Sequence, residues 1–352
     1  MFEISGETLR LIKKTCKGKK HLKLTVGYLT GNNSIIKIFN ENGELDSSIK
    51  YHYEIGSITK TFTSSLLSKY AFENKLSISD PIQKYIEELR EVEYYPTLLR
   101  LATHSSGYSA SLPLNKREYF NLILGLINGG GDMNKNNPLN MDLNKMKMLM
   151  DKNKLKDVDY SWKYSNFGMS LIGYGLGIVS GRGYWDTMND YLHNELGLRD
   201  TYLGTTNNNL HGYDRKNNDC GNWKWDKDNL ISPAGAISSN ADDLLKYAKI
   251  NICEDKPYLS LCHKKHGNGK KKYDMGLGWL LLKKNNNVIW HVGGTGCFSS
   301  FLGIDKEKKV ASVVLANYRL GMNDDENIGF SLLESLQKSK DELELPTYQS
   351  FI

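Results

Sequence analysis

Cysteine is scarce in this sequence, and its distribution excludes a disulfide framework. The chain has 352 residues and an odd number of widely separated cysteines: Cys16, Cys220, Cys253, Cys262 and Cys297. A small domain held together by disulfides would carry an even number at close, regular spacing, so the pattern favours a reducing compartment. Cys262, His263 and His266 have no second pair of ligands at zinc-finger spacing, and we therefore predict no metal site.

Long apolar segments are also absent. The longest weakly polar run, residues 167–179, has 13 residues and is too short to cross a bilayer. The N-terminus carries Glu3 and Glu7 and has no apolar core of signal-peptide length. We therefore expect a cytoplasmic protein without a transmembrane segment, although a chain from which an export signal had been removed would look the same.

A strong charge of one sign is missing as well. The 46 basic and 40 acidic residues leave a net charge of +6 that is spread along the chain. The densest basic run, residues 263–273, has two glycines and no helical period, which is typical of a solvated loop. We expect no nucleic-acid partner and no cofactor, and the sequence leaves the oligomeric state open.

The elements that the sequence does predict contain both helices and strands, as in the α/β class in its broad sense. Their order is typical of its α+β type. An amphipathic helix over residues 5–16 precedes two alternating segments joined by Gly-Asn-Asn, which predict an antiparallel hairpin. Strand patterns return only from residue 274, and a closing helix begins near residue 325. Both chain ends therefore build one antiparallel β-sheet flanked by terminal helices, with a helical region inserted between them.

This order also sets the expected organisation of the chain. We predict a single catalytic unit, residues 1–352, in which residues 1–56 and 272–345 form the sheet and its terminal helices. Residues 57–271 form the inserted, mainly helical region. We expect the active site at the junction of the two parts.

EIGSITKTF, residues 54–62, places Ser57 and Lys60 three positions apart at the start of a predicted helix. Positions i and i+3 lie one above the other on a helix, so the Lys60 amine can reach the Ser57 hydroxyl. The pair suits a nucleophile with its own proton acceptor. Taken alone, the motif also fits a surface helix with a hydroxyl cap and a solvated amine.

Three further segments bear on Ser57. Tyr164-Ser165-Asn166 begins a predicted helix, WHVGGTG (290–296) leaves a predicted strand, and SPAGAISSNADDLLKY (232–247) is a small-residue loop that feeds a capped helix. Each has a structural explanation when it is taken singly: a half-buried aromatic, a helix cap, a strand histidine or a tight turn. Their joint presence and order are more informative.

Together these segments resemble the serine penicillin-recognising superfamily, which includes class C β-lactamases, D-alanyl-D-alanine carboxypeptidases, D-aminopeptidases and related esterases. The resemblance covers about residues 20–320 and is carried by GSITKTFT, LATHSSG, WKYSNFGMSLIGYGL, SPAGAISSNADDLLKYA and HVGGTGCFSSFLGID. Tyr-x-Asn at position 164 matches the class C and carboxypeptidase branch rather than class A, whose second motif is Ser-Asp-Asn. The implied fold is β-lactamase/transpeptidase-like.

The resemblance implies a serine hydrolase that cleaves a small amide or ester, or a short peptide, through an acyl-enzyme on Ser57. We favour Tyr164 as the base, with Lys60 keeping the Tyr164 pKa low, although the sequence does not decide which of the two takes the proton. By the same resemblance Asn166 holds the substrate amide. His291 is expected beside the leaving group or a carboxylate of the substrate.

The resemblance also implies an oxyanion site made by the backbone N–H groups of Ser57 and Gly294. Glycine at positions 293 and 294 is expected because a side chain on Gly293 or Gly294 would block close approach of the substrate.

The third motif departs from the β-lactamase pattern. Lys-Thr-Gly is usual there, whereas His291-Val292-Gly293 resembles the carboxypeptidase, aminopeptidase and esterase branches. The departure argues against efficient β-lactam hydrolysis, so a true β-lactamase is the second hypothesis. A penicillin-binding sensor or pseudoenzyme that acylates without turnover is the alternative from another class. If His291 faces a carboxylate, its ordinary pKa near 6.5 predicts tighter binding of such substrates as pH falls.

Overall fold

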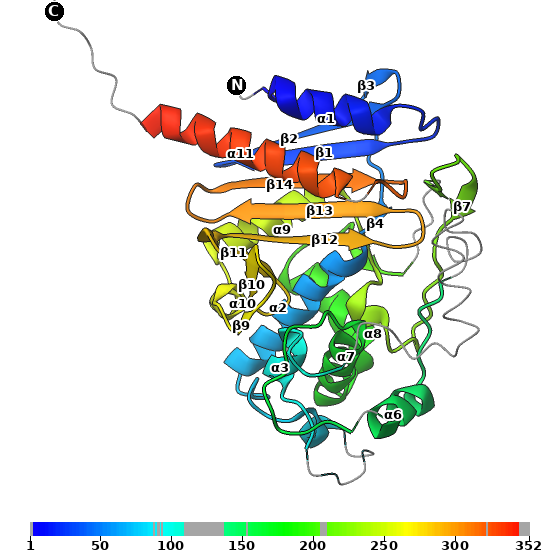
Figure 1. The fold of residues 1–352 in the computed structure, drawn as a ribbon, viewed down its shortest axis with the longest axis vertical. Helices are drawn as coiled ribbons and strands as arrows, with labels where there is room; N and C mark the ends of the chain where they lie inside the picture. The colour runs from blue at the N-terminus through cyan, green and yellow to red at the C-terminus, as the bar shows by residue number, and fades with distance from the viewer. Residues whose placement is uncertain are drawn as a thin grey trace, which may run out of the picture.

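The computed structural model describes residues 3–86, 89, 92, 94–108, 137–152, 154–204, 210–321 and 323–344. In this part of the chain a nine-stranded antiparallel sheet has the order β3-β2-β1-β14-β13-β12-β11-β10-β9. The sheet packs against a helical region, which lies below it in Figure 1. The predicted fold class is confirmed.

The sheet is assembled from the two ends of the chain. The two ends meet in the pair β1 and β14, in which Leu24 lies opposite Ala316 and Thr30 opposite Val310. The strands are β1 (Leu24–Thr30), β2 (Asn33–Asn40), β3 (Gly43–Leu45), β9 (Gly267–Asn268), β10 (Tyr273–Met275), β11 (Leu280–Leu282), β12 (Asn285–Gly294), β13 (Ser299–Asp305) and β14 (Val310–Ala316).

Both faces of the sheet are covered. The side chains of β14 are therefore buried on both faces, and its sequence is a continuous, mostly apolar run. Side chains alternate between the faces of a strand, so Val314 packs into the cluster under the terminal helices while Val313 and Leu315 pack toward the inserted region. The helices α1 (Gly6–Cys16) and α11 (Asp324–Glu344) cross the outer face in Figure 1. Helix α9 (Ala241–Cys253) covers the inner face.

The region between β3 and β9 contains most of the helices and several very short strands. Its helices are α2 (Thr59–Phe72), α3 (Leu98–Ala102), α6 (Leu143–Lys152), α7 (Asn166–Ser180), α8 (Gly183–Asp190), α9 and α10 (Leu259–His263), with single turns η1 (Gly56–Ile58), η2 (Ile82–Tyr85), η3 (Tyr191–Glu195) and η4 (Ser232–Ala234). The short strands are β4 (Tyr53–Glu54), β5 (Tyr202–Leu203), β6 (Gly212–Tyr213), β7 (Asp219–Gly221) and β8 (Ile237–Ser239). Strands β4, β8 and β5 form a small second sheet.

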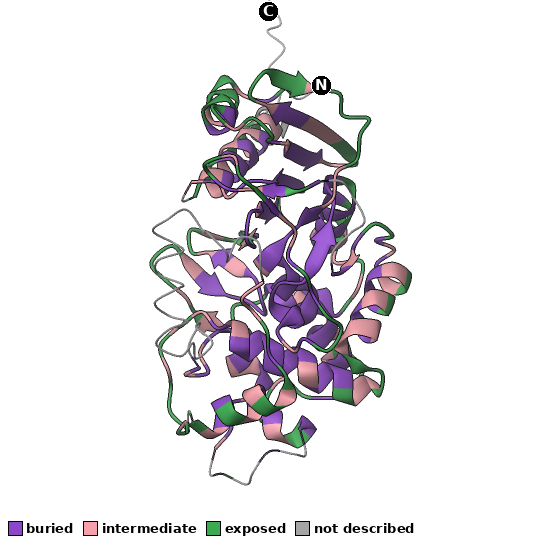
Figure 2. Cartoon of the chain, turned by 90° about the vertical axis from the view of Figure 1, so that its right-hand side faces the viewer, coloured by how far each residue is buried: buried purple, intermediate pink, exposed green. Residues whose placement is uncertain are grey.

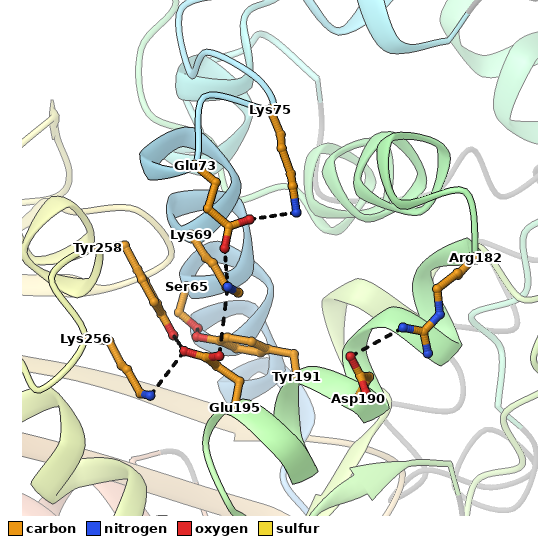
Figure 3. A network of polar contacts seen from close by, with 10 residues as sticks. All are labelled: Ser65, Lys69, Glu73, Lys75, Arg182, Asp190, Tyr191, Glu195, Lys256 and Tyr258. Carbon is orange, nitrogen blue, oxygen red and sulfur yellow. Dashed lines mark hydrogen bonds and ion pairs between the residues drawn. The ribbon is translucent and has the colours of Figure 1, made fainter.

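Helix α2 runs through the centre of the molecule and is buried over most of its length. Figure 2 shows buried residues concentrated where the large sheet meets the inserted helices, and exposed residues on the outer helices and turns. At the C-terminal half of α2, Ser65 receives a hydrogen bond from Tyr191, and Lys69 pairs with Glu73 and Glu195 (Figure 3). These contacts hold α2 in place from the end opposite Ser57.

None of the helices in the described ranges has the length and apolar character needed to cross a membrane.

Candidate active site

Ser57 lies in the single turn η1, between the end of β4 and the start of α2. Gly56 gives this turn its shape, with a φ of +50° that L side chains rarely adopt. A Cβ at position 56 would also stand 2.5 Å from the backbone N of Gly294, so the turn presses directly on the end of β12. The nucleophile candidate and the glycine segment of the third motif are therefore neighbours.

The structure brings Lys60 and Tyr164 to Ser57. The Lys60 Nζ lies 2.9 Å from the Ser57 Oγ, and the Tyr164 hydroxyl donates to the same oxygen at 2.6 Å. Lys60 is fully buried, and its amine also donates to the Ala234 carbonyl in η4, at 2.6 Å. The amine stands 4.9 Å from the centre of the Tyr164 ring. One hydroxyl thus meets two groups that can exchange its proton.

The directions of two pKa shifts bear on which group takes the proton. Burial lowers the pKa of Lys60 well below its ordinary value, and burial raises the pKa of Tyr164. A buried amine without its proton keeps a lone pair, whereas a buried phenol keeps its proton. The shifts oppose our expectation of a Tyr164 phenolate and favour Lys60 as the proton acceptor.

Tyr164 is held by a residue to which the sequence assigned no role. The His104 carbonyl accepts from the Lys163 N–H at 2.8 Å, and the His104 Nδ1 accepts from the Ser165 N–H at 3.2 Å. The rings of His104 and Tyr164 lie 4.7 Å apart. His104 therefore clamps the residues on both sides of Tyr164. Its place in LATHSSG was part of the resemblance, but its two-sided contact depends on a left-handed backbone, with φ at +59°, that the sequence did not indicate.

Asn166 is the first residue of α7, two positions after Tyr164. The helix begins here because Ser165 acts as its N-cap, accepting from the Gly168 N–H at 3.0 Å. Asn166 is half-buried at the same helix end. This arrangement leaves its proposed contact with a substrate amide as a prediction.

His291 lies on the face of β12 that meets the inserted region, but its environment corrects one expectation. The side chain is 3% exposed, and its Nδ1 lies 2.6 Å from the Val292 carbonyl oxygen. Burial, followed by the nearby Lys60, lowers the pKa of His291 to about 3. A histidine in this state is neutral throughout the range of pH 5.5 to 7.5. The expected charge-dependent binding of a carboxylate by His291 is therefore not supported.

Packing alone requires glycine at one of the two positions of the third motif. A Cβ on Gly293 would stand 2.0 Å from the Ile55 carbonyl oxygen, whereas a Cβ on Gly294 would meet only the Phe298 carbonyl, at 3.4 Å. Ser300 donates to the same Ile55 oxygen at 2.8 Å. Gly293 is therefore needed for contact between β12 and the residues before Ser57, and its part in substrate access stays a prediction.

One edge of β12 is open beside this contact. In the described part of the chain β11 pairs with β12 only as far as Trp290, while β13 pairs along the other edge as far as Gly294. Unpaired backbone groups at a strand edge can bind an extended peptide or amide. The open edge runs from His291 to Gly294, next to Ser57.

Comparisons with known proteins bear on the family and the fold of the chain. A family model described as Beta-lactamase matches residues 50–335. A curated protein described as Beta-lactamase, from Providencia stuartii, is 27% identical over 205 residues, which cover 57% of this chain and 47% of the relative. The chain spans less than two thirds of the length of the first curated relatives it matches, 47% and 61%.

Two solved structures show the similarity of fold. One described as a class C beta-lactamase superposes with a TM-score of 0.77 at 19% identity, covering 95% of this chain and 96% of that protein. One described as a Beta-Lactamase/D-Alanine Carboxypeptidase, from Pseudomonas syringae, has a TM-score of 0.72 at 16% identity, covering 93% and 97%.

Proposed function

Because the chain belongs to the beta-lactamase family, we propose that it is a serine hydrolase that forms an acyl-enzyme on Ser57. One observation carries the proposal: the Ser57 Oγ lies 2.9 Å from a buried lysine amine and 2.6 Å from a tyrosine hydroxyl. A serine hydroxyl becomes a useful nucleophile near neutral pH only if a positioned group takes its proton as it attacks.

In the proposed reaction the Ser57 oxygen attacks the substrate carbonyl while its proton passes to the neutral Lys60 amine. The carbonyl oxygen becomes an oxyanion, for which the backbone N–H groups of Ser57 and Gly294 are the proposed donors. Collapse of the intermediate breaks the bond to the leaving group. That group takes a proton through Tyr164, and Lys60 returns to its neutral form.

Deacylation reverses these roles. Water attacks the acyl carbonyl and gives one proton to Lys60, and the Ser57 oxygen leaves and recovers that proton. The proposed products are a carboxylic acid and either an amine or an alcohol. The open edge of β12 is the proposed support for the substrate backbone, with Asn166 on the opposite side of the substrate amide.

The proposed substrate is a small ester or amide, or a short peptide, that needs no carboxylate beside His291. A neutral histidine there cannot attract an anion as the lysine of a Lys-Thr-Gly motif would. This favours the esterase and peptidase branches. A true β-lactamase remains a second candidate, because the relative from Providencia stuartii carries that description.

Intact-mass spectrometry tests the proposal. After exposure to a fluorophosphonate, a nitrophenyl ester and a panel of β-lactams, we expect a covalent adduct that is absent from Ser57→Ala. Labelling that persists in Ser57→Ala, or appears on Ser64 or Ser105 instead, refutes the assignment. An ester adduct that clears with turnover indicates a hydrolase, whereas an adduct that stays for hours indicates a sensor.

A further inference from the structure

Glu54 is a buried acid that the reaction above does not use. It ends β4, three residues before Ser57, and is 3% exposed. Its Oε1 accepts a hydrogen bond of 2.7 Å from the Trp223 N–H. Its Oε2 is buried without a partner in the described structure, and so is the Oγ1 of Thr295. Thr295 is nevertheless close enough to lower the Glu54 pKa, so the two unsatisfied atoms belong to one buried polar cluster.

This cluster of Glu54 and Thr295 adjoins the proposed oxyanion donors, Ser57 and Gly294, along the chain. Thr295 directly follows Gly294, and its N–H donates to the Phe298 carbonyl at 3.3 Å in the turn between β12 and β13. The residues after Glu54 touch the residues before Thr295, since a Cβ on Gly56 or Gly293 would strike the opposite backbone. Glu54 therefore lies between the end of β4, which precedes Ser57, and the β12–β13 turn, which follows Gly294.

We propose that Glu54 is a positioning residue that acts in its protonated form, with its carboxyl donating to Thr295 and accepting from the Trp223 N–H. This arrangement gives a partner to both unsatisfied atoms, the Glu54 Oε2 and the Thr295 Oγ1. If Glu54 were ionised, the Thr295 hydroxyl could donate to it instead, but a negative charge would then be buried. An ionised Glu54 would also oppose the negative charge that develops on the oxyanion in front of it. The inference rests on the proposed acylation of Ser57.

The surroundings of Glu54 allow the change of state to occur near neutral pH. Burial raises the Glu54 pKa to about 7, against smaller lowering effects of Thr295, the Trp223 N–H and Asn222. In the described part of the chain no charged group acts on it from β4, from its partner strand β8, from residues 222–223 or from the β12–β13 turn. Glu54 therefore titrates on its own rather than as half of an ion pair.

Glu54→Gln separates charge from structure. The amide keeps the shape, can donate to Thr295 and accept from the Trp223 N–H, and cannot ionise. We would measure the acylation rate constant with a nitrophenyl ester by stopped flow from pH 5.5 to 8.5. The ratio of variant to wild type cancels the titration of Lys60 and Tyr164. We expect a ratio near 1 at pH 5.5 that rises to about tenfold at pH 8.5.

A ratio that stays flat, or a folded variant that is slow at every pH, overturns the proposal. Thr295→Val provides a second test, because valine can neither accept from the protonated Glu54 carboxyl nor donate to its ionised form. We expect the midpoint of the rise in the Glu54→Gln ratio, remeasured in the Thr295→Val background, to shift along the pH axis. An unchanged midpoint contradicts the Glu54–Thr295 link. Failure of the proposed function looks different, since wild type would then form no acyl-enzyme at any pH.

Discussion

Gly293→Ala is the sharpest test of how the site is assembled. The added methyl group would stand 2.0 Å from the Ile55 carbonyl oxygen and 2.4 Å from the Ser300 Oγ. Ordinary contact begins near 3.4 Å, so β12 and the residues before Ser57 would have to separate by about 1.4 Å. Neither neighbour can yield cheaply, because the first is backbone and the second is hydrogen-bonded to that backbone at 2.8 Å.

The expected cost follows from that displacement. A misplacement of about 1 Å between reacting groups lowers a rate by about a hundredfold, and forced overpacking costs about 1–3 kcal/mol of stability. We therefore expect Gly293→Ala to lower the acylation rate by about a hundredfold and to destabilise the fold by about 2 kcal/mol.

Gly294→Ala is the matched control. Its methyl group meets the Phe298 carbonyl only at 3.4 Å, so the fold should tolerate it, and any effect should appear in KM through contact with the substrate. The assays are stopped-flow acylation with a nitrophenyl ester and urea unfolding of both variants. If Gly293→Ala acylates within about threefold of wild type at unchanged stability, the contact between β12 and Ile55 does not position the site.

Three further predictions concern protons. Lys60→Met and Tyr164→Phe should each slow stopped-flow acylation by about two to four orders of magnitude, with the double variant little worse than either, and additive losses would show that the two do not act as a unit. A substrate ester bearing a carboxylate and its neutral analogue should show the same dependence of KM on pH between 5.5 and 7.5, because His291 stays neutral, and tighter binding of the carboxylate alone at low pH would contradict this. Since the Glu54 pKa is raised from 4.5 to about 7, the wild-type fold loses stability as pH rises through that interval. By pH 8 Glu54→Gln should therefore be more stable than wild type by about 3 kcal/mol in urea unfolding. A difference in stability between variant and wild type that is equal at pH 5 and pH 8 would refute the shift.

Local patterns predicted the parts of the site that depend on sequence spacing. Ser57 and Lys60 meet because three residues make nearly one turn, and the sheet could be predicted because its strands are long enough to show alternation or continuous burial. The strands β4, β5 and β8 have two or three residues and carry no period, so the small sheet that supports Ser57 had no signal in the sequence.

The parts that the sequence did not indicate depend on contacts across the chain. The Ala234 carbonyl accepts a hydrogen bond from Lys60, which lies 174 positions away along the chain, and nothing in SPAGA indicates that contact. The state of His291 follows from burial beside Lys60, which spacing cannot supply. Gly293 was predicted to be glycine for access by the substrate, whereas the backbone of Ile55 already excludes a side chain there.

The burial of the site determines when charged groups form in it. Burial lowers the pKa of Lys60, His104 and His291 and raises that of Tyr164, so each of these groups is driven toward its neutral form before a substrate arrives. In the proposed acylation two charges form together, a cation on Lys60 and an oxyanion on the substrate. In a buried site these charges attract each other more strongly than they would in bulk solvent. The proposed neutral Glu54 would preserve that balance, and a charged Glu54 would disturb it.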